Sequence, residues 1–206
     1  MTKRQLAALF TIDLAIFSIG GVVVALAPIY TSRLGADSTL TGFYLSAEFA
    51  AVAVGAVITG WLSDRFQRRK ILLIIAGLIE IAAIWLMGQA TNMPQLFAFT
   101  VVYAFLAGMQ FTLVNILAGL FAEESERGRV FGIIGSAVAL GGLVGGLAGG
   151  PIVDRWGFTG MFTVAALSGK TRQFLGQTQD RMSISPSLCD PSGSSKHHVC
   201  LLGGFL

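Results

Sequence analysis

Charged residues are scarce in this sequence. They make up 12% of its 206 residues, about half the share that is usual in a soluble domain. The net charge is only +3, and the basic residues lie at the ends of apolar stretches instead of forming a continuous patch. Nucleic-acid binding needs such a patch, so no nucleic-acid partner is expected.

Cysteine and histidine are almost absent, and those present lie near the C-terminus. Cys189 and Cys200 do not make a disulfide framework. His197 and His198 are the only histidines, which leaves no metal-ligand spacing and no Ser-His-Asp set. A phosphate-binding G-x-x-x-x-G-K-[ST] loop is also missing. We therefore expect no cofactor, no metal and no enzyme activity; a small membrane enzyme is a disfavoured alternative.

Long apolar stretches dominate the sequence, in which 54% of the residues are hydrophobic. A helix needs about 20 mostly apolar residues to cross a bilayer. A sixth stretch begins near residue 160 and loses its apolar character after Leu167. The sequence predicts an all-α membrane protein whose surroundings are the lipid bilayer. The five full-length spans are predicted at residues 6–30, 41–62, 71–89, 96–122 and 130–153.

The basic residues predict how the chain is oriented. Lys and Arg are more frequent in cytoplasmic segments of membrane proteins. If the N-terminus is cytoplasmic, the outer loops contain only Arg33 and Arg155. We therefore predict a multi-pass protein of the cytoplasmic (inner) membrane with its N-terminus inside. The inner segments then contain Lys3, Arg4, Arg65, Arg68, Arg69, Lys70, Arg127 and Arg129.

The composition changes after residue 167. The segment 168–206 is polar and rich in Ser and Pro in its second half. A complete sixth span would need about ten more apolar residues. We therefore divide the chain into a membrane bundle at 1–167 and an atypical tail at 168–206, either disordered or read out of frame. A short sixth span followed by a disordered cytoplasmic tail is the alternative.

The segment after the second span carries a motif. It resembles the signature loop of the major facilitator superfamily, G-x-L-x-D-R-x-G-R-R. Gln67 stands where that family usually has glycine. The residues in register are Gly60, Leu62, Asp64, Arg65, Arg68 and Arg69.

The resemblance implies a fold of two six-helix halves with the substrate between them and transport by alternating access. This chain would be the N-terminal half with its sixth helix incomplete. It would work with a second half or as a self-dimer. In the family the loop aspartate is thought to hold the two halves together on the inside, a role that falls here to Asp64 and Arg65. Arg68 and Arg69 could instead only keep the loop in the cytoplasm.

The fifth predicted span contains small residues at helical spacing. Glycines four residues apart let helix backbones approach closely in a membrane. The pattern also resembles the fifth-helix motif of proton-coupled antiporters, G-x8-G-x3-G-P-x2-G-G, with Ala137 in place of one glycine and Gly142 in place of its proline. Generic helix packing is the alternative. The glycines that match the antiporter motif are Gly128, Gly141, Gly145 and Gly146, and the packing set is Gly141, Gly145, Gly146, Gly149 and Gly150.

Three carboxyl groups fall inside predicted spans: Asp13, Glu48 and Glu80. Ionisable groups in hydrocarbon are costly and usually face a cavity or a partner. A poorly solvated carboxyl group can take up and release a proton near neutral pH. We take these three and Asn115 as candidate proton or substrate sites; a structural role is the alternative for each. Gln110 could add a hydrogen bond.

One position departs from the resemblance. Many proton-coupled members carry an arginine early in the fourth span, four residues before a glycine. Counting back from Gly108 places Ala104 there, which counts against the usual coupling scheme. The predicted function is transport of a small-molecule substrate, with proton-coupled efflux ahead of uptake, by a truncated half. A non-transporting membrane fragment of a damaged gene is the alternative.

Overall fold

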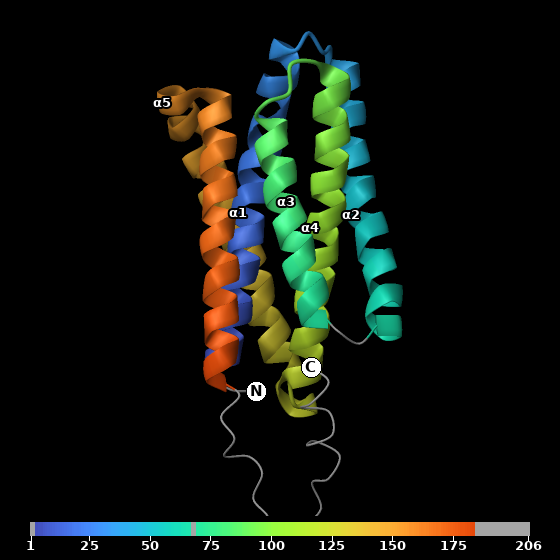
Figure 1. Ribbon diagram of the computed structural model, residues 1–206, viewed down its shortest axis with the longest axis vertical. Helices are drawn as coiled ribbons and strands as arrows, with labels where there is room; N and C mark the ends of the chain where they lie inside the picture. The colour runs from blue at the N-terminus through green and yellow to red at the C-terminus, as the bar shows by residue number, and fades with distance from the viewer. Residues whose placement is uncertain (1–2, 67–68, 184–206) are drawn as a thin grey trace, which may run out of the picture.

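A computed structural model describes residues 3–66 and 69–183 of the chain. In these residues it forms five α-helices and one short 3-10 helix, and no strand. Figure 1 shows the helices side by side in one elongated bundle. The elements are α1 (Lys3–Arg33), α2 (Ser38–Phe66), α3 (Arg69–Met87), α4 (Met93–Phe121), η1 (Glu124–Glu126) and α5 (Arg127–Ser183).

Helix α5 consists of two helical segments joined at Gly157. This residue has φ 68°, a left-handed conformation that glycine adopts without a steric cost. The chain reverses there, and the second segment runs back along the bundle (Figure 1). Helix α5 therefore contains both the fifth and the sixth predicted segment. The all-α membrane fold predicted from the sequence is confirmed.

The second segment of α5 continues to Ser183, past Leu167, where its apolar character ends. A helix does not need apolar residues, and residues 168–183 contain no proline; the next one is Pro186. The tail from residue 168 is predicted to be disordered or read out of frame, and the structure describes its residues 168–183 as helical. Residues 184–206 lie outside the described part of the chain, and the division into two regions at residue 167 stays a prediction.

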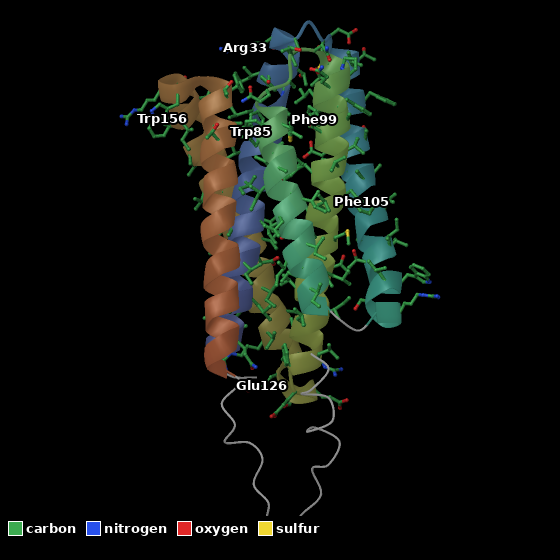
Figure 2. All side chains as sticks on the ribbon, in the orientation of Figure 1. Arg33, Trp85, Phe99, Phe105, Glu126 and Trp156 are labelled. Atoms are coloured by element: carbon green, nitrogen blue, oxygen red, sulfur yellow. The ribbon has the colours of Figure 1, made fainter. Side chains whose placement is uncertain are left out.

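The bundle has two ends, which we name by the chain. The N-terminal face is the end where α1 begins and where η1 lies; the opposite face holds the turn between α1 and α2 and the reversal at Gly157 (Figure 1). Figure 2 shows Glu126 at the N-terminal face and Arg33 and Trp156 at the opposite face. Helices α1 and α3 run from the first face to the second, and α2 and α4 run back.

The outer surface of the bundle is apolar. Val57 is 75% exposed and Leu147 is 70% exposed, as expected for side chains in contact with lipid rather than water. In the described residues, four helical stretches are long and apolar enough to cross a membrane, and α3 contributes a shorter apolar stretch, Ile71–Met87. The protein is therefore a multi-pass membrane protein.

Two helix pairs approach each other through glycine. In what we call the α1–α5 seam, a Cβ atom on Gly145 would overlap the carbonyl oxygen of Ser18, and one on Gly21 would lie 2.6 Å from that of Gly142. In the α2–α4 seam, the corresponding overlaps join Gly55 to Phe105 and Gly108 to Val52. Backbone contact of this kind is how helices pack tightly in a membrane.

Candidate functional site

Asp13 lies inside the bundle with no partner. Its side chain is 0% exposed, and neither carboxylate oxygen has a hydrogen-bond partner. Leu9, one turn earlier on α1, packs with Val114 and Ile134 in an apolar cluster between α1, α4 and α5. An ionised carboxylate without a partner is strongly disfavoured in such a place. The structure therefore puts Asp13 where the protonated, uncharged carboxyl group is the form that fits.

Glu48 is the second buried carboxyl group with an unpaired oxygen. It lies on α2, is 5% exposed, and its Oε2 has no hydrogen-bond partner. One turn nearer the opposite face, the hydroxyl groups of Tyr44 and Thr100 are hydrogen-bonded at 2.7 Å and join α2 to α4. Asp13 lies in the half of α1 nearer the N-terminal face, and Glu48 lies in the half of α2 nearer the opposite face. The structure therefore does not bring these two carboxyl groups together into one site.

Glu80 differs from the other two because it is paired. Gln110 on α4 donates a hydrogen bond from Nε2 to Glu80 Oε2 on α3, and both side chains are buried. Ala76, Leu106 and Met109 form the apolar cluster next to them. A satisfied buried pair of this kind connects two helices. Its geometry indicates a structural role for Glu80.

Replacing Gln110 with leucine should therefore destabilise the contact between α3 and α4. Buried hydrogen bonds between membrane helices contribute about 1 kcal/mol to stability, and Gln110→Leu should lose that amount. Glu80→Gln keeps a side chain of the same shape that can accept the bond, so it should lose less. Unfolding in a denaturing detergent, followed by circular dichroism, measures both. Equal losses would contradict a specific hydrogen bond.

Asn115 lies on α4, one turn from Phe111. Its Nδ2 donates to the carbonyl oxygen of Phe111 at 2.8 Å, and its side chain is partly exposed. The ring of Phe111 meets that of Phe17 on α1 edge to face, with centroids 5.4 Å apart. Because Asp13 is one turn from Phe17 on α1, Asp13 and Asn115 lie at a similar depth on adjacent helices. This aromatic pair was not predicted from the sequence.

The signature motif begins inside α2 and not in a loop. Helix α2 continues to Phe66, so Gly60 to Arg65 occupy its last turns at the N-terminal face. Leu62 packs on the cluster between α3 and α4. Asp64 and Arg65 are exposed, and the guanidinium group of Arg65 lies 5.8 Å from the centre of the Trp61 ring. Arg68 lies outside the described residues, and Arg69 begins α3.

The candidate glycines of α5 divide into two sets by direction. Gly141, Gly145 and Gly149 face α1, where added Cβ atoms would meet Leu14, Ser18 and Leu26. A Cβ atom on Gly146 or Gly150 would meet nothing within 4 Å, and the same holds for Gly128. Only the first set packs inside the bundle.

The face of α2 that packs on α4 has a pattern in the sequence. Tyr44, Glu48, Gly55, Thr59 and Ser63 follow one another at intervals of about one or two helical turns along α2. All five are buried. A stripe of polar and small residues within an apolar helix therefore indicated the face that packs on α4.

At the opposite face, the reversal after Gly157 packs on α1 and α3. The rings of Tyr30 and Phe158 stack with their centroids 4.7 Å apart. The guanidinium group of Arg33 lies 4.8 Å from the centre of the Phe158 ring. Thr159 donates a hydrogen bond to the carbonyl oxygen of Gly88 at 3.2 Å. Tyr30 and Phe158 also line a small cavity together with Tyr44. The second segment of α5 is thus anchored to the rest of the bundle.

Comparison with known proteins identifies the family to which this chain belongs. The sequence profile of the Major Facilitator Superfamily matches residues 8–169, which is most of the chain and includes all three buried carboxyl groups. The chain belongs to the Major Facilitator Superfamily. The family is one of membrane transporters. The resemblance inferred from the signature motif is confirmed.

Individual superfamily relatives are named for multidrug resistance or for efflux. The Multidrug resistance protein MdtG of Klebsiella pneumoniae is 29% identical over 150 residues, which cover 70% of this chain and 36% of the relative. The agnestins efflux protein of Paecilomyces divaricatus is 26% identical over 162 residues, 77% of this chain and 36% of the relative. This superfamily chain thus aligns with little more than a third of these relatives' length.

Proposed function

We propose that this protein transports a small molecule across the cytoplasmic membrane by alternating access, as an exporter driven by protons. The described helices would form the N-terminal six-helix half of the carrier. A second half, or a second copy of this chain, would supply the other side of the substrate cavity. The names of the relatives in bacteria and in a fungus support export over uptake.

The observation that carries the proposal is the state of Asp13. Its carboxyl group is fully buried and has no hydrogen-bond partner, so the protonated form fits this environment. The carboxyl group can lose its proton only when a conformational change exposes it. A group that binds a proton in one conformation and releases it in another is what proton coupling requires. Asp13 therefore serves as the proton site of the transport cycle.

The substrate would bind near Asp13 but not on it. Asp13 is covered by the chain's own helices, whereas a substrate held between two halves touches the outer surface of each. Asn115, Phe17 and Phe111 are partly exposed and lie about one turn away. Two aromatic rings and an amide suit an apolar molecule with a polar group.

The end of α2 would control the inner side of the cavity. Asp64 and Arg65 are exposed at the N-terminal face, where they can pair with a facing helix end of the second half. The excess of basic residues at this face supports a cytoplasmic N-terminus. Proton-driven export then takes substrate from this face and releases it at the opposite one.

The test is flux in vesicles that contain this chain and no other protein. Labelled lipophilic cations, sugars and amino acids are offered with and without a pH gradient. We expect gradient-dependent flux of one class, lost when a protonophore collapses the gradient and strongly reduced in Asp64→Asn. Flux no greater than in empty vesicles, with the chain shown to be inserted, would contradict the proposal.

A further inference from the structure

The surface of the helices between the two faces carries no exposed charge in the part whose side chains the structure describes. Asp13 is 0% exposed, Glu48 is 5% exposed and Glu80 is 7% exposed. The exposed charged side chains of α1, α2, α4 and the first segment of α5 all lie near one face or the other. A charged molecule held against these helices at membrane depth would therefore meet no opposite charge on the described surface.

The polar groups that are accessible on α4 are mainly hydrogen-bond acceptors. Asn115 donates from Nδ2 to the carbonyl oxygen of Phe111 at 2.8 Å, which leaves its Oδ1 atom and one N–H free. Thr112 donates its hydroxyl proton to the carbonyl oxygen of Gly108 at 3.0 Å, so that its oxygen can only accept a further bond. No other described group donates to either oxygen.

These two acceptors lie together on one helix face. Asn115 and Thr112 are both partly exposed, and residues three apart on a helix are neighbours on its surface. Asn115 is also one turn from Phe111, whose ring contacts that of Phe17 on α1. A molecule seated here would touch two acceptor oxygens and an aromatic pair at the same time.

The aromatic pair is shaped for apolar surface and not for a cation. The rings of Phe17 and Phe111 are 84° from parallel, with the edge of one against the face of the other. A quaternary ammonium ion is bound by several ring faces turned toward it, and in this pair one face is already covered by the partner ring. The remaining surface suits the apolar face of an uncharged molecule.

We propose that the substrate is an uncharged molecule with an apolar face and a hydroxyl or N–H group that donates a hydrogen bond to Asn115 or Thr112. The inference rests on the proposed transport function and names its substrate class. An uncharged molecule avoids the cost of stripping water from a charge that finds no counter-charge. Of the classes offered in the flux test, the sugars fit, whereas lipophilic cations and amino acids are excluded.

Three probes that share one naphthalene ring test the two requirements separately. At neutral pH 2-naphthol is uncharged and donates a hydrogen bond, 2-methoxynaphthalene is uncharged and cannot donate, and the trimethyl(2-naphthyl)ammonium ion is charged and cannot donate. Tritium-labelled 2-naphthol is bound to the purified full chain in detergent, and each unlabelled compound is added as a competitor. The signal from empty micelles is subtracted, so that only saturable binding is compared.

We expect 2-naphthol to displace the label at the lowest concentration. The methyl ether should need about tenfold more, because it loses one hydrogen bond, and the ammonium ion should need at least about tenfold more than the ether. Displacement by the ammonium ion at or below the concentration of the ether would overturn the uncharged class. Equal displacement by 2-naphthol and its ether would overturn the hydrogen-bond donor, and no saturable binding of 2-naphthol would overturn both.

The double variant Asn115→Leu, Thr112→Val tests the two residues. It removes both acceptors with little change of size, so 2-naphthol and its methyl ether should bind equally, each about as tightly as the ether binds the unaltered chain. Continued binding of the ether reports that the bundle is folded. Ser136→Ala is the matched control, because Ser136 is exposed on α5 and donates to the carbonyl oxygen of Ile133 at 2.7 Å; it should keep the preference for 2-naphthol. The same preference in the double variant would show that the bond is accepted elsewhere and overturn the proposal.

The binding measurement needs no flux, so it separates the two proposals. Preference for 2-naphthol that depends on Asn115 and Thr112, in a chain without gradient-dependent flux, would leave the binding class standing and remove the proposed function. Gradient-dependent flux of lipophilic cations would support the function and overturn the substrate class.

Discussion

Asp13→Asn should abolish the stimulation of flux by a pH gradient while flux down a substrate gradient continues. Asparagine has nearly the shape of a protonated aspartic acid, so the apolar cluster around residue 13 keeps its packing. It cannot release a proton, however, and the step that links proton movement to the conformational change is lost. The measurement is substrate flux in vesicles with a pH gradient and with a substrate gradient alone.

Asp154→Asn is the matched control for this substitution. Asp154 is exposed near the opposite face, so its replacement by asparagine removes a carboxylate that is not buried inside the bundle. It should leave both kinds of flux unchanged. Equal stimulation by the pH gradient in Asp13→Asn and in the unaltered protein would show that another group carries the proton.

Gly145→Ala should be the most destabilising single-methyl change in the fold. The added Cβ atom would overlap the carbonyl oxygen of Ser18, which belongs to a helix backbone and cannot rotate away. Overpacking of this kind typically costs about 1–3 kcal/mol, and here α1 and α5 must separate. The measurement is the midpoint of thermal unfolding in detergent, followed by circular dichroism.

Gly146→Ala is the control for that substitution in the same helix. A Cβ atom on Gly146 meets nothing within 4 Å, and alanine is the better helix former. Its unfolding midpoint should be equal to or above that of the unaltered protein. Equal midpoints for the two alanine variants would mean that α1 does not pack on this side of α5.

The fold was predictable because its signals are local. The length of each apolar stretch indicates a membrane helix. The reversal between the two segments of α5 occurs at Gly157, because glycine adopts a positive φ without a steric cost. The helices exceed the predicted apolar stretches because polar residues also form helix: α2 continues to Phe66, which places Asp64 and Arg65 on a helix. The continuation of α5 to Ser183 has the same cause.

The site was predictable only in part, because the partner of a buried side chain is set by packing between distant residues. Asp13, Glu48 and Glu80 look alike in sequence, each a carboxyl group in an apolar stretch. Only the packed bundle distinguishes them: Glu80 meets Gln110 on α4, whereas both carboxylate oxygens of Asp13 and the Oε2 atom of Glu48 have no hydrogen-bond partner. The register of α2 on α4, in which Tyr44 meets Thr100, likewise depends on contacts across the bundle.

Proton movement driven by substrate is the most direct test of proton-coupled transport by this chain. The chain is reconstituted into vesicles that contain a pH-sensitive dye, and a gradient of a transported substrate is applied with no initial pH gradient. We expect the internal pH to change as substrate moves, because an antiporter moves protons in the direction opposite to substrate, and we expect Asp13→Asn to remove this change. Substrate movement with no change of internal pH in the unaltered protein would contradict it.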